Sequence, residues 1–132
     1  MTGHFLAICP DDCRRLLAAA TVGRVGWASS AGVQIIPVNV FLHGDALYVR
    51  VDPASILAEL AADTGIEAAI EVDDVDPETA TGWSVLAQGR ATRHDGPAPD
   101  AALRPWAPGE RKLLVRLDIA SLSGRSVSAP IP

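Results

Sequence analysis

Residues 48–60, YVRVDPASILAEL, contain the residue types that hold a phosphate group. A segment rich in β-branched residues leads into Asp52-Pro53, after which apolar residues recur at helical spacing. Arg50 and Ser55 flank this junction, where an arginine, a hydroxyl and free backbone N–H groups favour an anion. The local pattern alone favours a simpler interpretation, in which Asp52 caps the helix, Pro53 is its first residue and Ser55 its third, worth about 1 kcal/mol.

Other residues that could do chemistry lack the partners that such chemistry needs. Ser84 lies in GWSVL, which lacks the final glycine of a hydrolase nucleophile elbow and falls inside a strand pattern. The acidic segment 71–78 does not have EF-hand spacing and is interpreted as solvated. No side chain is identified as a catalytic acid or base.

Cysteines and histidines give no metal or redox motif. Cys9 and Cys13 fit neither a redox Cys-x-x-Cys nor a zinc knuckle, and a disulfide across one helical turn would be strained. They are predicted to be reduced, structural thiols. No metal site is predicted, because the histidines are isolated from one another at His4, His43 and His94.

Composition narrows the partners and the compartment. The net charge of −5 comes without a basic stripe, so nucleic acid is not expected as a partner. No apolar run approaches the length of a membrane span and no signal peptide is recognised, so a cytoplasmic protein without membrane contact is expected. The hydrophobic fraction of 48% and mean hydropathy of +0.21 predict a large core or apolar surface buried between subunits.

The elements that must position these residues are mostly strands within a single domain, 1–132. Helices are expected over 11–20 and 53–64, with a short one near 99–104. Alternating or β-branched patterns predict strands over 23–30, 33–43, 46–51, 66–73, 82–94 and 111–119. Such spacing is typical of a small antiparallel barrel.

Three local features refine this picture. Pro37 cannot donate to a strand ladder, so its strand is predicted to lie at an edge or to be bulged there. Gly44-Asp45 is predicted to form a tight hairpin turn, and Gly89 to allow a sharp bend. An acidic loop is expected over 73–82, and a polar tail after 119.

The order of the segments resembles that of the small pyridoxamine 5'-phosphate oxidase-like proteins. The most specific pieces are TGWSVLAQGRA and the pair GRVGWAS/IIPVN, and the likeness covers nearly the whole chain. The resemblance implies a mainly β fold, a six-stranded antiparallel Greek-key split β-barrel with two or three short helices. It also implies a homodimer with FMN bound between the subunits.

The resemblance further implies which residues meet the cofactor. The second predicted strand would line the isoalloxazine, and the third strand with its following junction would hold the phosphate. Two residues would approach the flavin from the other subunit, and two near the C-terminus would supply aromatic and cationic groups. The residues at the isoalloxazine would be Ile35, Ile36, Pro37, Val38 and Asn39, and those at the phosphate Val49, Arg50 and Ser55. The residues from the other subunit would be Trp83 and Ser84, and the aromatic and cationic groups Trp106 and Arg116.

One position departs from the family pattern. Members commonly carry a lysine just after the Ser55 position, where this chain has Ile56. Losing a charged contact to the phosphate would weaken FMN binding by roughly ten- to a hundredfold.

The expected function is FMN-dependent oxidation or reduction of a small molecule, with the hydride chemistry carried by the flavin. The alternatives are a barrel that has lost productive flavin binding, a deazaflavin-using relative, and a haem-binding relative.

Overall fold

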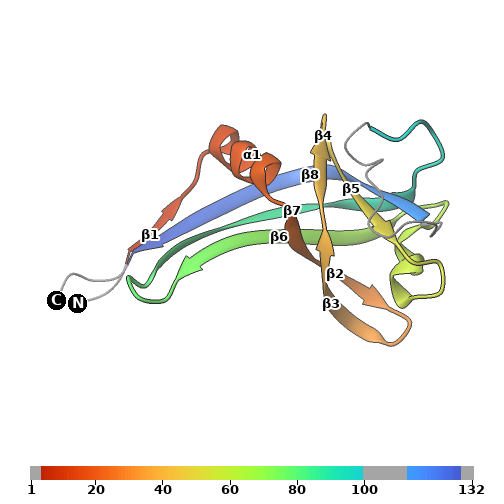
Figure 1. Cartoon of the computed structure of the whole chain (residues 1–132), viewed down its shortest axis with the longest axis horizontal. Helices are drawn as coiled ribbons and strands as arrows, with labels where there is room; N and C mark the ends of the chain where they lie inside the picture. Colours follow the sequence, from red (N-terminus) through yellow and green to blue (C-terminus); the bar gives the residue numbers. More distant parts are fainter. Residues whose placement is uncertain (1–3, 100–112, 129–132) are drawn as a thin grey trace.

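The computed structural model describes residues 4–99 and 113–128, which form a strongly curled antiparallel sheet with one α-helix and one 3-10 helix (Figure 1). In chain order the elements are β1 (His4–Ala7), α1 (Pro10–Ala19), β2 (Val22–Ser29), β3 (Gly32–Asn39), β4 (Phe41–His43), β5 (Ala46–Val51), the 3-10 helix η1 (Ile56–Leu60), β6 (Ile66–Asp76), β7 (Thr81–Arg93) and β8 (Leu113–Ser128). The long strands β6, β7 and β8 run side by side along the sheet.

A bend at Val40 closes the curl of the sheet. The strand order is β3-β2-β6-β7-β8-β5-β4, so β3 and β4 lie at opposite ends although they are consecutive in the chain. The N–H of Val40 donates to the carbonyl of Thr21 at 3.1 Å, which fixes the bend. Because one bent segment pairs with β2 and then with β5, it joins the two edges into a split barrel.

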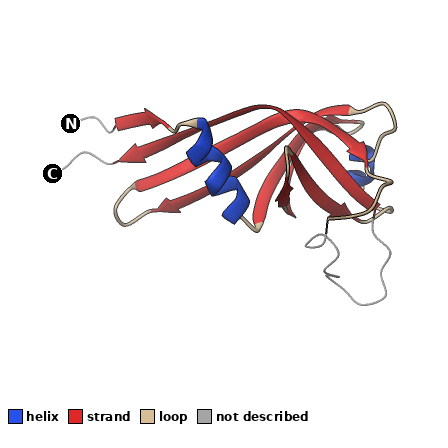
Figure 2. Cartoon of the chain, turned by 90° about the horizontal axis from the view of Figure 1, so that it is seen from above, coloured by secondary structure: helices blue, strands red, loops and turns tan. Residues whose placement is uncertain are grey.

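The core fills the inner face of the curled sheet, and α1 packs over β8 on one side of it (Figure 2). Cys13 and Leu17 of α1 are both 0% exposed. A Cβ on Gly124 of β8 would lie 2.7 Å from the sulfur of Cys13, so only glycine lets the helix approach this closely. The largest side chains below 2% exposure are Leu17, Leu47, Leu60, Ile70 and Leu117.

Several predictions from the sequence are confirmed. The fold is mainly β and antiparallel, and the predicted helix over 11–20 is found as α1. β3 is an edge strand, as Pro37 required. Gly44, with φ of +60°, lies in the turn of the β4–β5 hairpin. The bend expected at Gly89 is a β-bulge between Gln88 and Gly89 in the β7–β8 ladder.

The predicted number of six strands is wrong, because the described residues form eight. β1 is an additional strand of four residues that pairs with the end of β8. The strand predicted over 33–43 is divided into β3 and β4 by the bend at Val40. A period-two pattern of apolar residues continues through such a bend, so the sequence does not reveal it.

The helix predicted over 53–64 is also wrong, since only Ile56–Leu60 is helical and its form is 3-10. A tight turn replaces the expected first helical turn. The Asp52 carboxylate accepts from the N–H of Ala54 at 2.8 Å, and the Asp52 carbonyl accepts from the N–H and the hydroxyl of Ser55. Asp52 therefore caps this turn rather than a helix.

The polar tail expected after residue 119 is instead the second half of β8. The bulge opposite Gly89 inserts Ala120 as an extra residue, so the alternation changes phase there. Leu117 and Ile119 pack toward the core before it, and Leu122 does so after it. The acidic loop over 73–82 is likewise shorter than predicted, because β6 extends to Asp76 and β7 begins at Thr81. The short helix predicted near 99–104 falls almost wholly outside the described residues.

Candidate functional site

β5 separates the barrel core from a second, smaller apolar layer on its outer face. Leu47, Val49 and Val51 point inward and are buried in the core. Ala46 and Tyr48 point outward and are also buried, among Phe41, Ala98 and Leu114. Arg50 continues this outward row at the end of β5 and is half-buried. The alternation of a strand thus places the Arg50 guanidinium on the face opposite the core.

Arg116 of β8 lies on the same outer face. In the β5–β8 ladder Tyr48 is opposite Arg116 and Arg50 is opposite Leu114, so the two arginines are diagonal neighbours. Diagonal neighbours in a sheet lie about 7–8 Å apart, within reach of long side chains. On the other side Thr92 of β7 is opposite Arg116. The N–H of His94 donates to the carbonyl of Leu114 at 2.8 Å and continues this ladder.

Both arginines have a buried nitrogen without a hydrogen bond. The Nε atoms of Arg50 and Arg116 are inaccessible to solvent and make no hydrogen bond with any described residue. Arg116 Nε lies 3.2 Å from a carboxylate oxygen of Asp118, which is ion-pair distance without hydrogen-bond alignment. An unpaired buried donor destabilises a protein by about 1–3 kcal/mol, so these two nitrogens indicate an acceptor that the described residues do not supply.

His94 and Tyr48 border this pair. A terminal nitrogen of Arg116 lies 3.5 Å from Nδ1 of His94, and Nε2 of His94 lies 3.0 Å from the carbonyl of Pro97. Because a carbonyl only accepts, Nε2 is the ring atom that carries the hydrogen, which leaves Nδ1 to accept from Arg116. The rings of His94 and Tyr48 form a T-shaped pair with their centroids 5.2 Å apart. Tyr48, Arg50, His94 and Arg116 are called the outer-face site below.

The predicted flavin-lining segment of β3 contributes only alternate side chains to the outer surface. Ile35, Pro37 and Asn39 point outward, and Ile35 is 69% exposed. Ile36 and Val38 pack toward the core, as does Val49, so a ligand could meet only their backbone. Phe41 is opposite Tyr48 in the β4–β5 ladder, which ends there, whereas Asn39 belongs to the β2–β3 ladder and is opposite Val22.

The Ser55-Ile56 junction lies beyond the end of β5. The Ser55 hydroxyl donates to the carbonyl of Asp52 at 2.9 Å, and Ile56 packs against the core. Glu59 fixes η1 to the β2–β3 hairpin by accepting from the indole N–H of Trp27 at 3.3 Å and from the N–H of Ser30 at 3.2 Å. Hydrogen bonds from the hydroxyl of Ser30, from Trp27 and from the N–H of Ser30 lower the pKa of Glu59.

Trp83 and Ser84 lie far from the outer-face site within one chain. They are near the start of β7, and Ser84 is eight residues from Thr92, or about 26 Å along an extended strand. Both line a cleft of about 510 Å³ whose apolar walls include Phe5, Val75 and Val127. Within a single chain, Trp83 and Ser84 therefore lie far from Arg50, whereas Arg116 lies beside it. Trp106 is outside the described residues.

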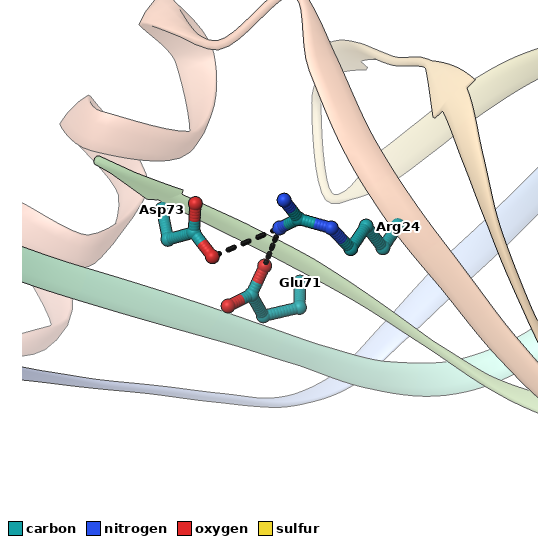
Figure 3. A network of polar contacts seen from close by, with 3 residues as sticks. All are labelled: Arg24, Glu71 and Asp73. Carbon is teal, nitrogen blue, oxygen red and sulfur yellow. Dashed lines mark hydrogen bonds and ion pairs between the residues drawn. The ribbon is translucent and has the colours of Figure 1, made fainter. Parts of the chain in front are cut away.

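Figure 3 shows a charged cluster between β2 and β6 that the sequence did not reveal. Arg24 of β2 binds the carboxylates of Glu71 at 3.2 Å and Asp73 at 2.9 Å, both on β6. Burial and the adjacent Asp73 raise the pKa of Glu71, while Arg24 opposes that rise. The expected solvated acidic segment is thus partly paired, and only the β2–β6 register, with Arg24 opposite Glu71, shows it.

Other kinds of site find no support in residues 4–99 and 113–128. This part of the chain contains no group of three or more His, Cys, Asp or Glu that could hold a metal ion. Cys9 and Cys13 are both free, and Cys13 is on the buried face of α1. None of the described helices is both long and apolar enough to span a membrane.

Known proteins share this sequence pattern and this fold. The family described as pyridoxamine 5'-phosphate oxidase matches residues 10–126. An uncharacterized protein of Mycobacterium tuberculosis, Rv0080, is 32% identical over 126 residues, covering 90% of this chain and 83% of the relative.

Solved structures agree on the fold. The FAD-binding protein of Mycobacterium smegmatis superposes with a TM-score of 0.71 at 21% identity, covering 93% of this chain and 98% of that one. A FAD- and haem-binding protein of the same organism gives a TM-score of 0.69 at 16% identity, covering 100% of this chain and 76% of that one. With the family match over most of its length, the chain belongs to the pyridoxamine 5'-phosphate oxidase-like split-barrel family.

Proposed function

We propose that this protein is a flavin-binding oxidoreductase that acts on a small molecule, with FMN held by its phosphate at the outer-face site. The two buried, unpaired nitrogens of Arg50 and Arg116 carry this proposal. A phosphate dianion offers several strong acceptors to guanidinium groups and would pair these nitrogens once the part-exposed side chains turn toward it. Relatives of this fold that bind FAD, or FAD and haem, support a flavin.

The residues around the arginines suit the rest of such a ligand. Asn39, Pro37 and Ile35 form an outward, largely apolar row along β3. A flat aromatic ring system could lie along this row, with the polar end of the ligand at Arg50. A bound flavin would supply the hydride chemistry, and the protein would bind and orient it.

We also propose a homodimer, because one chain holds only part of the site. Ser84 is about 26 Å along β7 from the residue opposite Arg116, and Trp83 is one residue further, so they would reach the flavin only from a second copy. The outer face also exposes apolar side chains, with Val33 at 78% and Ile35 at 69%. Exposed apolar surface of this kind is typical of an interface.

The histidines give less support to haem. Both ring nitrogens of His94 have partners in Arg116 and Pro97, and His43 is exposed at the end of β4.

The experiment that tests the proposed function also includes haem and the deazaflavin alternative. The purified protein is examined for its visible spectrum and then titrated with FMN, FAD and a deazaflavin cofactor. Saturable FMN binding at micromolar concentration is expected. A Soret band, or binding of the deazaflavin alone, would contradict the FMN proposal.

Bleaching of the bound flavin by a reduced nicotinamide, followed by reoxidation, would support an oxidoreductase. A protein that binds FMN but passes no electrons with nicotinamide or oxygen would instead be a non-catalytic flavin-binding barrel.

Replacing Ile56 with lysine should tighten FMN binding about tenfold. The long stem of a lysine can keep part of the apolar packing of Ile56 while its ammonium group reaches toward the phosphate. Fluorescence titration of FMN measures the change, and Ile56→Met is the matched control because it keeps the stem without the charge. Equal affinity in Ile56→Lys and Ile56→Met would place the phosphate elsewhere.

Replacing Ile35 with aspartate should convert the dimer into a monomer, because a charge would be desolvated at the interface. Light scattering after size-exclusion chromatography measures the mass, and circular dichroism checks the fold. Leu6→Asp is the control: Leu6 is 64% exposed, but the strand register turns it to the opposite face of the sheet from Ile35. A monomeric parent protein, or a dimeric Ile35→Asp, would refute this interface.

A further inference from the structure

The cleft of about 510 Å³ near the start of β7 is a second place where a ligand could bind, apart from the outer-face site. Its apolar walls include Phe5 of β1, Val75 of β6 and Val127 of β8, and it also contains Ser84 and Arg125. Phe5 is 69% exposed and Val75 is 64% exposed, so a bound molecule would remove apolar surface from water. A cleft of this volume, largely apolar with a few polar groups, is typical of a small-molecule site.

Arg125 is a charged group of this cleft that has no partner among the described residues. It is exposed, and it makes neither a hydrogen bond nor an ion pair with residues 4–99 and 113–128. Its Cζ atom lies 5.7 Å from the centre of the Phe5 ring, a distance at which the ring attracts a guanidinium. This contact positions Arg125 but uses none of its N–H groups in a conventional hydrogen bond, so they remain available to an acceptor.

Ser84 supplies a hydroxyl beside this guanidinium. It is directly opposite Arg125 in the β7–β8 ladder, so both side chains lie on the face of the sheet away from the buried Val85. Directly opposite residues have Cβ atoms about 4.5–5.5 Å apart, so the two side chains can donate to the same acceptor. A neighbouring cleft of about 550 Å³ is also lined by Ser84 and Arg125, so the pair can be approached from both clefts.

The carboxylates of the cleft lie on its opposite wall and already have a cation. Asp73 of β6 is opposite Ser84 on the side away from β8, so the β6 and β8 walls are two strand spacings, about 10 Å, apart. Arg24 binds Asp73 at 2.9 Å and Glu71 at 3.2 Å (Figure 3). The paired charges of the cleft are therefore at β6, and its positive charge without a described partner is at β8.

We propose that this cleft, called the Arg125 cleft below, binds a small apolar carboxylic acid. The carboxylate accepts from Arg125 and Ser84, and the apolar part lies against the wall that includes Phe5. The planar guanidinium fork suits a carboxylate better than it suits a neutral group. The identification of this acid as the substrate rests on the proposed function, because a dimer that brings Ser84 to the flavin opens the Arg125 cleft beside it. The cleft binds and orients the acid, and no bond of the carboxylate forms or breaks.

The test compares three probes of similar shape: phenylacetate, the neutral phenylacetamide and the cationic phenethylamine. Titration calorimetry of the full chain, without flavin, should show saturable binding of phenylacetate about tenfold tighter than that of phenylacetamide. Arg125→Gln should bind phenylacetate only as tightly as phenylacetamide, with the affinity for the amide unchanged. Arg15→Gln is the matched control, because Arg15 is an exposed arginine on α1 that pairs with Asp12 at 2.9 Å. It should keep the preference of the parent for the acid.

The outcomes separate this inference from the proposed function. The inference is overturned if phenethylamine binds most tightly, if phenylacetate shows no saturable binding, or if Arg125→Gln binds phenylacetate as the parent does, whether or not the protein binds flavin. Binding of the acid that depends on Arg125, in a protein that binds no flavin, would support the ligand site while the proposed function fails. In a protein that binds FMN, Arg125→Gln should leave the FMN affinity unchanged. Weaker FMN binding would make Arg125 a cofactor residue and contradict its assignment to the acid.

Discussion

Replacing Gly89 with alanine should destabilise the protein by about 3 kcal/mol or more, a large part of the stability of a domain this size. A Cβ at this position would lie 1.8 Å from the carbonyl oxygen of Asp118 and 2.8 Å from its carbonyl carbon. Both are backbone atoms of β8, so no side-chain rotation relieves the overlap. The strands must separate at the bulge, where β7 and β8 hold the barrel together.

Urea denaturation followed by circular dichroism measures this effect. Gly26→Ala is the matched control, since Gly26 is also within a strand but its added Cβ would lie 3.7 Å from the nearest atom, an ordinary contact. Its stability should be unchanged or slightly raised, because glycine is unfavourable within a strand. A Gly89→Ala protein as stable as the Gly26→Ala protein would show that the bulge does not need glycine.

Replacing Arg50 with methionine should have opposite effects on binding and on stability. The variant loses the main phosphate contact, so FMN affinity should fall about a hundredfold while riboflavin affinity is retained. The ligand-free protein should become more stable by about 1 kcal/mol, because methionine keeps the length of the side chain and removes the buried, unpaired Nε. A gain of stability with a loss of binding is typical of residues held in place for a ligand.

Two measurements on the same protein check this expectation. Urea denaturation without ligand gives the stability, and titration with FMN and riboflavin gives the affinities. Arg90→Met is the control, since Arg90 donates to the carbonyl of Gly65 and should lose stability rather than gain it. If Arg50→Met were less stable than the parent, Arg50 would have a structural partner and the outer-face site would lose its main support.

The sequence by itself determined the features that depend on local chemistry. Pro10 begins α1, Gly44 forms the hairpin turn through its positive φ, and Pro37 marks an edge strand. Each of these restricts the backbone within a few residues, so a short stretch of sequence is enough. The family resemblance added the split-barrel fold and pointed to Arg50 and Arg116 from their places in the chain.

The local sequence pattern gave a wrong prediction where contacts with residues distant in the chain compete with helix formation. Asp52-Pro53 and the apolar spacing after it are typical of a helix start, yet the turn around Asp52 and the contacts of Glu59 with Trp27 and Ser30 leave only a short 3-10 helix. Tertiary hydrogen bonds commonly outweigh helix propensity over so few residues.

Only the tertiary structure decided how the outer-face site is assembled. The bulge opposite Gly89 shifts the alternation of β8 by one residue, which keeps Leu117 and Leu122 in the core although they are five positions apart in the strand. The same register turns Arg116 outward and sets it diagonally to Arg50. A strand register is fixed by pairing across the sheet, and a slip of one residue would reverse every side chain, so no local pattern can reveal which residues become neighbours.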